Sequence, residues 1–393
     1  MMKIVKNLAL AVMAFAAVAC NDEGGKGGNK SPYSADITTP ANCYIVAPGS
    51  TVRFVANIGN TAEKAVFTTA ELTWQDVQGM VTKVDAQADK GKVVVTLASG
   101  IEGNALVSVK DAEGKIVWNY HLWVTNYQPE KNVINYSYSR TTTAEDGTET
   151  TDNFAFVMMD RYIGALSAEA GNAKAHGLHY NWGRPAPVFA ATSQQGAPQA
   201  YFTIAGDTVA NAVKQPVEVE DNIANAIANP TIHYNSGSDG YYGWISNSSA
   251  YIKANCGDMW GGVSATQTKY DPCPAGWRVA PYQAYKFLGG DKAVEAAEVT
   301  KVFDGVGEEN KNIVGWNYNI NGATLYIPSC GEFNNNGGYS NGAGTNWPNG
   351  KAWTAGADSD NARAWGTNIS PSSASYAQGL AVSYTLPVRC IKL

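Results

Sequence analysis

The sequence predicts a β-rich, α+β protein of two domains, the first of them an immunoglobulin-like β-sandwich. The 393 residues are enough for two domains with cores of their own. Charged residues make up only 16% of the chain, against the usual quarter, and Gly, Asn, Ser, Thr, Tyr and Trp replace them, as on extracellular β-rich surfaces. Short apolar runs separated by turn residues recur throughout residues 36–128.

The first domain, residues 36–128, contains six segments with the pattern of strands. In the clearest of them, IVWNYHLWV, Ile116, Trp118 and Tyr120 begin one apolar face. His121 lies on the other face without a catalytic or metal-binding partner nearby in sequence, which favours a structural role. Six or seven strands in about ninety residues are typical of an immunoglobulin-like sandwich, although the Cys-Trp-Cys spacing of antibody domains is absent. The predicted strands are Cys43–Ala47, Thr51–Ala56, Ala70–Trp74, Lys92–Leu97, Ala105–Val109 and Ile116–Val124.

The N-terminus predicts an exported protein. Residues 1–19 combine Lys3 and Lys6 with an apolar run and end on small residues, which is the pattern of a signal peptide. The apolar run, residues 8–18, is too short to span a bilayer.

The residues around the expected cleavage site resemble a bacterial lipobox, although Ala17 stands where Leu is usual. This resemblance implies that Cys20 is acylated and that residues 20–35 form a Gly-rich, flexible tether. Asp22 and Glu23 resemble the acidic surface-export signal of Bacteroidetes lipoproteins. We therefore expect a lipid-anchored protein on the cell-surface side of the outer membrane, with the periplasmic side as the alternative.

The second half begins with a linker at residues 129–152, in which Asp146-Gly147 is placed to turn a hairpin. Phe154–Asp160 follows as a buried strand. Five motifs then occur in order: MMDRYIGALSA, GLHYNWGR, DPCPAGWRV, KAWT and PVRCIKL. Together they resemble the Fibrobacter succinogenes major paralogous domain of Bacteroidetes surface lipoproteins. The resemblance implies a C-type-lectin-like α+β domain over residues 153–393, with ANCYIV and IVWNYHLWV belonging to the partner module that precedes it.

The sequence departs from that family in two places. Ala280-Pro281 stands where Pro-Thr is usual, so the hydroxyl cap is lost, but Pro281 still permits a helix over Tyr282–Leu288. Tyr162 stands where Asn is common. A second helix is predicted over Asp291–Phe303.

Export implies an oxidising compartment in which disulfides form. Cys273 and Cys390 are interpreted as the clasp of a loop of over a hundred residues. Cys256 and Cys330 are the second candidate pair, which leaves Cys43 alone. No C-x-x-C pair is present, which argues against a zinc ribbon or a redox site.

The loop at residues 331–365 is the predicted ligand site, because aromatic rings stack on sugar C–H faces while amides bind hydroxyls. Trp353 is expected in the core instead. Calcium-dependent lectins carry Glu-Pro-Asn or Gln-Pro-Asp here and neither occurs, so no cofactor is predicted, although Asp358 and Asp360 remain candidates for holding calcium. The predicted ligand contacts are Tyr339, Asn346, Trp347, Asn349 and Trp365.

No catalytic constellation is recognised. His176 and His179 form an H-x-x-H without the Glu or third ligand of a zinc site. Basic residues are scattered over a chain of net charge -6, which argues against nucleic acid as a partner. The sequence therefore predicts a non-enzymatic adhesion module for a glycan or a host or matrix glycoprotein. A fimbria-associated structural or tip subunit and an unrecognised enzyme remain the alternatives.

Overall fold

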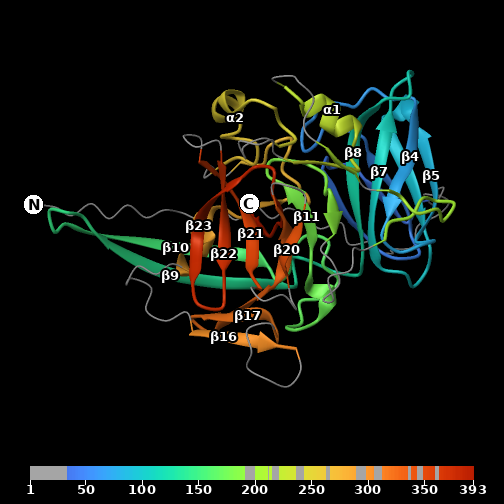
Figure 1. Ribbon diagram of the computed structural model, residues 1–393. Helices are drawn as coiled ribbons and strands as arrows, with labels where there is room; N and C mark the ends of the chain where they lie inside the picture. Colours follow the sequence, from blue (N-terminus) through green and yellow to red (C-terminus); the bar gives the residue numbers. More distant parts are fainter. Residues whose placement is uncertain are drawn as a thin grey trace, which may run out of the picture. The chain divides into compact units, whose positions relative to one another are not determined.

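The computed structural model describes residues 33–190, 200–210, 212–214, 221–235, 243–262, 266–288, 298–304, 312–334, 338–342, 348–358 and 363–393. The predicted signal peptide, Cys20, Asn346 and Trp347 lie outside these ranges. Residues 33–393 form one compact unit, which is β-rich and built from several separate sheets (Figure 1). The predicted β-rich, α+β class is confirmed. No helix in the described ranges is long and apolar enough to cross a membrane.

The first part of the chain is a sandwich of two four-stranded sheets. Their inner faces enclose one core, to which Phe54, Val95 and Val107 contribute. All six predicted strands are confirmed. The strand order of the first sheet is β1 (Ala35–Ile37), β3 (Thr51–Val55), β6 (Lys92–Leu97), β5 (Val81–Gln87). That of the second sheet is β2 (Cys43–Val46), β8 (Ile116–Val124), β7 (Gly103–Lys110), β4 (Thr69–Gln75). The short 3-10 helix η1 (Ala88–Lys90) joins β5 to β6.

The outer face of β8 is buried by the rest of the chain. His121 is almost completely buried, and its Nε2 lies 2.9 Å from Asn104 Oδ1. Asn119 donates a hydrogen bond to the carbonyl of Ile227 in α1 (Ile223–Ala228) at 2.8 Å. Trp123 belongs to the large core of the second part. The sandwich is therefore joined to the second part by a packed interface.

The sandwich also docks on the loop that precedes the Cys273 motif. Asn42 donates its side-chain amide to the carbonyls of Lys269 and Asp271, both at 2.8 Å, and accepts from Trp118 Nε1 at 2.9 Å. Asn60 donates to the Asp271 carbonyl as well, at 2.8 Å. These amides satisfy loop carbonyls that packing would otherwise leave without partners.

Replacing Gly59 by alanine should lower the free energy of unfolding by roughly 2–3 kcal/mol. The new Cβ would lie 1.8 Å from the Lys269 carbonyl oxygen, at a residue whose φ is +59°. Urea denaturation measures the loss. Gly100→Ala is the matched control, because its φ is +73° but nothing lies within 4 Å of an added Cβ. It should cost only the left-handed strain, roughly 1–2 kcal/mol, and equal losses in the two variants would contradict the steric argument.

The second part contains five sheets and short helices. One sheet has the strand order β15 (Trp277–Val279), β25 (Cys390–Lys392), β10 (Glu149–Met159), β9 (Val133–Thr143), and a second has the order β12 (Phe189–Ala190), β11 (Leu178–Asn181), β24 (Thr385–Pro387), β19 (Cys330–Phe333), β20 (Tyr339–Gly342). Two three-stranded sheets follow, β16 (Glu298–Phe303), β17 (Ile313–Ile320), β18 (Ala323–Pro328), and β21 (Gly350–Asp358), β22 (Arg363–Ile369), β23 (Ala374–Ala381). The fifth sheet is the pair β13 (Ala212–Lys214) and β14 (Ile232–Tyr234). The helical segments besides α1 are η2 (Ala173–Ala175), α2 (Ser249–Asn255) and η3 (Tyr282–Leu288).

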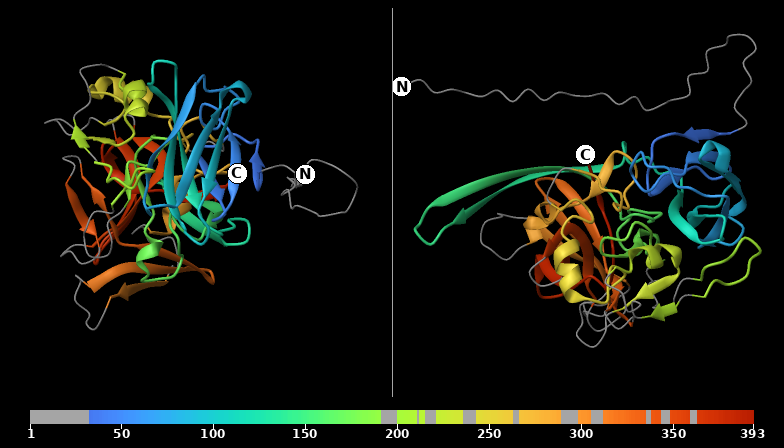
Figure 2. Two further views of the ribbon diagram at one scale, coloured as in Figure 1. Left: turned by 90° about the vertical axis from the view of Figure 1, so that its right-hand side faces the viewer. Right: turned by 90° about the horizontal axis from the view of Figure 1, so that it is seen from above.

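β9 and β10 form the predicted hairpin, which turns at Asp146-Gly147 and is longer than expected. The Gly147 N–H donates to the Ala144 carbonyl at 2.9 Å, with φ of +84° at Gly147. β10 runs through residues 152 and 153, so one strand joins the predicted linker to the predicted buried strand. The end of the hairpin is exposed and extends away from the neighbouring sheets (Figures 1 and 2).

One helix prediction is wrong. Residues 298–303 form β16, which pairs with β17, whereas residues 291–297 lie outside the described ranges. Val299, Thr300 and Val302 are β-branched and favour a strand once a partner strand is available. The predicted helix over Tyr282–Leu288 is present, as the 3-10 helix η3.

The predicted clasp is confirmed: Cys273 and Cys390 form a disulfide across a sequence separation of 117. The pairing of Cys256 with Cys330 is wrong, because both are buried thiols, as is Cys43. Cys256 packs in the main core of the second part, whereas Cys330 packs with Tyr162 and Ala352.

Candidate functional site on an aromatic ledge

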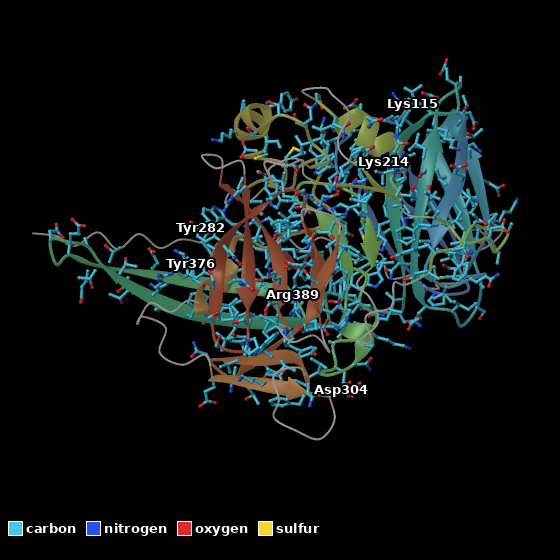
Figure 3. The ribbon with its side chains drawn as sticks, viewed as in Figure 1. Lys115, Lys214, Tyr282, Asp304, Tyr376 and Arg389 are labelled. Carbon is cyan, nitrogen blue, oxygen red and sulfur yellow. A yellow bond between two sulfur atoms is a disulfide. The ribbon has the colours of Figure 1, made fainter. Side chains whose placement is uncertain are left out.

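Four half-buried aromatic side chains from separate segments gather beside the base of the β9–β10 hairpin. The rings of Tyr282 and Tyr376 stack with centroids 6.2 Å apart and an interplanar angle of 21°, and Figure 3 labels both in this region. Trp365 lies beside Tyr282. Phe154, on β10, and Tyr282 both contact the ammonium group of Lys286. We call this set the aromatic ledge: Phe154, Tyr282, Trp365 and Tyr376.

The hairpin and η3 position the first two of these rings. The inner side of η3 is buried, which leaves Tyr282 and Lys286 on its outer side. Tyr136 donates its hydroxyl to the Ala284 carbonyl at 2.6 Å, and Tyr138 donates to the Gln283 carbonyl. Two tyrosines of β9 therefore fix the backbone of η3.

Gly356 allows two of the aromatic residues to lie close together. A Cβ built on this residue would be 3.0 Å from Trp365 Cδ1 and 3.4 Å from Tyr282 Cδ1. Both side chains therefore pack over the bare backbone of β21. A Cβ at residue 356 would require the indole of Trp365 or the phenol of Tyr282 to shift by a few tenths of an ångström.

Two cations lie against the aromatic ledge. Lys286 Nζ is 5.0 Å from the centroid of Phe154 and 5.7 Å from that of Tyr282. Arg140 is only 5% exposed; its Cζ is 5.2 Å from the centroid of Tyr376, and its Nη1 donates to the Tyr376 hydroxyl at 2.9 Å. Such cation–π contacts are attractive and also bring positive charge to an aromatic surface.

The predicted ligand residues do not all meet at the aromatic ledge. Trp365 belongs to it. Tyr339 packs on Phe333, with centroids 5.6 Å apart, and donates its hydroxyl to the Cys330 carbonyl at 3.0 Å. Asn349 is half-buried, and its backbone carbonyl accepts from Ser329. Trp353 is fully buried, as expected.

Sequence reasoning missed most of the aromatic ledge. Tyr282, Tyr376 and Phe154 are far apart in the chain, and each is unremarkable in its own segment. One signal was present: Phe154 and Phe156 alternate on β10, and they face Tyr138 and Tyr136 across the hairpin. Recognising residues 133–143 as the partner strand of the predicted hairpin would have placed these four rings on one face.

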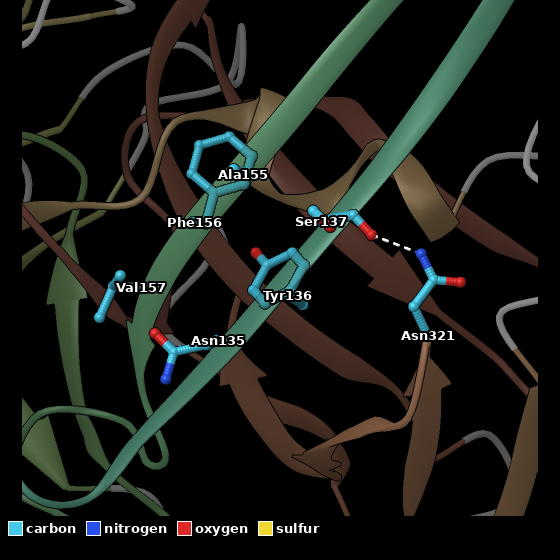
Figure 4. Close-up of a pocket in the computed structure, with 7 residues that line it drawn as sticks. All are labelled: Asn135, Tyr136, Ser137, Ala155, Phe156, Val157 and Asn321. Atoms are coloured by element: carbon cyan, nitrogen blue, oxygen red, sulfur yellow. Dashed lines mark hydrogen bonds between the residues drawn. The ribbon is translucent and has the colours of Figure 1, made fainter. Parts of the chain in front are cut away.

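A second surface feature lies on the hairpin (Figure 4). It is an open hollow of about 380 Å³ lined by uncharged residues. Ser137 and Ala155 are small, which leaves room between their neighbours. Asn321, at the turn between β17 and β18, donates to the Ser137 carbonyl at 2.6 Å. The lining residues are Asn135, Tyr136, Ser137, Ala155, Phe156, Val157 and Asn321.

His179 and His233 are buried, whereas His176 is half-buried. His179 and His233 pack against Phe333, with ring centroids 6.1 and 6.2 Å from it. Burial lowers the pKa of His179 to about 3 and that of His233 to about 4. Among the described residues, no group of three or more His, Cys, Asp or Glu is arranged to hold a metal ion. Asp360 and the side chain of Asp358, the calcium candidates, lie outside the description.

Glu332 and Lys351 form a buried ion pair on β19 and β21, with Lys351 Nζ 2.6 Å from Glu332 Oε2. The two side chains are 3% and 7% exposed. Removing Glu332 would leave the buried ammonium group of Lys351 without this ion pair, which is costly for a buried charge. The pair is therefore read as part of the framework that joins these two sheets.

Comparison with known proteins does not place the chain in a family. No family model matches it, and no curated protein or solved structure matches it at a significant level. The resemblance to the Fibrobacter succinogenes major paralogous domain therefore stays a prediction.

Proposed function

We propose that this protein is a surface-exposed, lipid-anchored adhesion module that binds glycans or glycoproteins on the aromatic ledge. The observation that carries the proposal is the cluster of half-buried rings, which includes the phenol of Tyr282 and lies against the ammonium group of Lys286. Sugars stack their C–H faces on aromatic rings, and neighbouring polar groups fix their orientation. The stacked rings of Tyr282 and Tyr376 lie on η3 and β23, and two tyrosines of β9 fix the backbone of η3, so little reordering is required when a ligand binds.

The remaining parts of the proposal come from the sequence. The lipobox-like segment with acylation at Cys20, the outer-membrane location and the C-type-lectin-like relationship are proposed together with the binding function. No catalytic role is proposed. The packed interface between the sandwich and the second part supports a module that presents its ligand surface in a fixed orientation.

A glycan array tests the proposal. A soluble form carrying Cys20→Ala should bind at least one glycan class, and Trp365→Ala should weaken that binding by about tenfold, or ~1.4 kcal/mol, because a stacking surface is lost. Tyr339→Phe and Ser137→Val, which alter the β19–β20 hairpin and the hollow, serve as controls and should bind normally. An array without hits would reject the glycan proposal, and isolation from cells as a ladder of assembled subunits would favour the fimbrial alternative.

A further inference from the structure

We infer that the glycan bound at the aromatic ledge is acidic, and that Lys286 recognises the carboxylate or sulfate that it carries. The inference rests on the proposed function and names the ligand class of that same site. Three observations carry it: the contacts of Lys286, the hydroxyl of Tyr282 and the charges beside the aromatic ledge.

Within the part of the chain that the structure describes, aromatic rings contact the ammonium group of Lys286 and carboxylates do not. Its ammonium group lies over Phe154 and Tyr282, and no ion pair involves it within the described ranges. By contrast, Lys92, Lys110 and Lys351 each contact a carboxylate at 2.6–2.7 Å. A cation on an aromatic surface retains the capacity to bind an anion, and charge-assisted hydrogen bonds are the stronger kind.

Tyr282 adds a hydrogen-bond donor. Its ring stacks on Tyr376, while its hydroxyl makes no hydrogen bond within the described part of the chain. The ring face, the phenol and the ammonium group of Lys286 therefore lie on one short helix, η3. An acidic sugar matches this set, because its ring stacks while its anionic group accepts from both donors.

The charges around the ligand surface also favour an anion. Arg140 lies against Tyr376, so a second positive charge stands behind the rings. Asp152 lies opposite Arg140 in the register of the hairpin, and its side chain is exposed to solvent, which screens its charge.

Matched glycans that differ in an anionic group test the inference. The probes are polygalacturonate against its methyl ester, keratan sulfate against desulfated keratan sulfate, and sialyllactose against its methyl ester. We expect the soluble Cys20→Ala form to bind at least one acidic member tenfold or more tightly than its neutral counterpart by isothermal titration calorimetry in 50 mM salt, and the preference to shrink in 200 mM salt. The first pair isolates carboxylates and the second isolates sulfates.

Lys286→Met preserves most of the side-chain length and removes the charge. It should abolish the preference, so that the acidic and neutral members of each pair bind with equal affinity. Lys301→Met, at an exposed position on β16, is the matched control and should retain the preference. Equal binding of acidic and neutral members that is lost in Trp365→Ala would overturn the inference and leave the proposed function standing. Failure to bind any of the probes or any array glycan would overturn both.

Discussion

Serine at both Cys273 and Cys390 is expected to lower the free energy of unfolding by roughly 4–5 kcal/mol. The disulfide closes a loop with a sequence separation of 117, and in the chain-entropy model a cross-link over such a distance strongly restricts the unfolded chain. The folded state should survive the change, because β15 and β25 remain paired through their backbones. Urea denaturation under oxidising conditions measures the difference.

The single variants provide the control for this prediction. Cys273→Ser and Cys390→Ser each open the same loop, so each should lose nearly as much stability as the double variant. Wild-type protein that is reduced and kept reduced should match them. A loss below about 1 kcal/mol in the double variant would contradict the loop-closure argument.

Acidification from pH 6.5 to 4.5 is expected to destabilise the protein by roughly 2–3 kcal/mol per pH unit. Burial lowers the pKa of His121 and His179 to about 3 and that of His233 to about 4, against 6.5 for an ordinary histidine. In this range the unfolded chain therefore binds three protons that the folded chain excludes. Stability is present above pH 6.5 and is lost as the pH falls.

Asp271 acts with the opposite sign. Burial raises the pKa of its carboxyl group to about 7, although the backbone N–H groups of Cys273 and Val279 donate to it and oppose that shift. The stability that Asp271 contributes is complete below about pH 4 and is lost as the pH rises to 7. In the range between, the folded chain binds one proton on Asp271 that the unfolded chain does not, so the net excess of protons on the unfolded chain falls from three to two. Urea midpoints at pH 7.5, 6.0 and 5.0 measure the slope.

Variants assign the slope to particular groups. His121→Asn should flatten it by about one proton, or ~1.4 kcal/mol per pH unit, and Asp271→Asn should steepen it by the same amount. The comparison concerns slopes, so it holds even where a variant shifts the absolute stability. A wild-type curve that is flat between pH 7.5 and 5.0 would contradict the prediction.

The strands of the first part were predictable because each apolar run ends at a turn signal. β5 was missed because Lys83 and Asp85 interrupt its apolar pattern. Both residues are kept in a strand by the pairing of β5 with β6. Residues 298–303 show the reverse error. Their helical appearance in DKAVEAAEVTKVF is overridden by pairing with β17, a tertiary effect that local periodicity does not contain.

The candidate site was predictable only in part. Trp365 was identified by the residue types around it, whereas Tyr282, Lys286 and Tyr376 join it through the packing of η3 against β22 and β23. Gly356 leaves room for the rings of Trp365 and Tyr282 over β21, yet a glycine that allows close approach carries no sign of its partners in the sequence. Sites assembled from distant segments become visible only when those segments are placed together.

The clasp also bears on how the protein would carry mechanical load. Tyr282, Trp365 and Tyr376 lie inside the covalent loop between Cys273 and Cys390, and the proposed anchor, Cys20, lies outside it. Without the bond, a pull on Trp365 could draw out up to roughly 300 Å of contour length from the 92 residues between Cys273 and Trp365. With the bond intact, the shorter covalent path runs through the two sulfur atoms and the 25 residues from Cys390 back to Trp365, roughly 80 Å at most. A ligand held under flow would therefore meet a linkage with much less slack in this part of the chain.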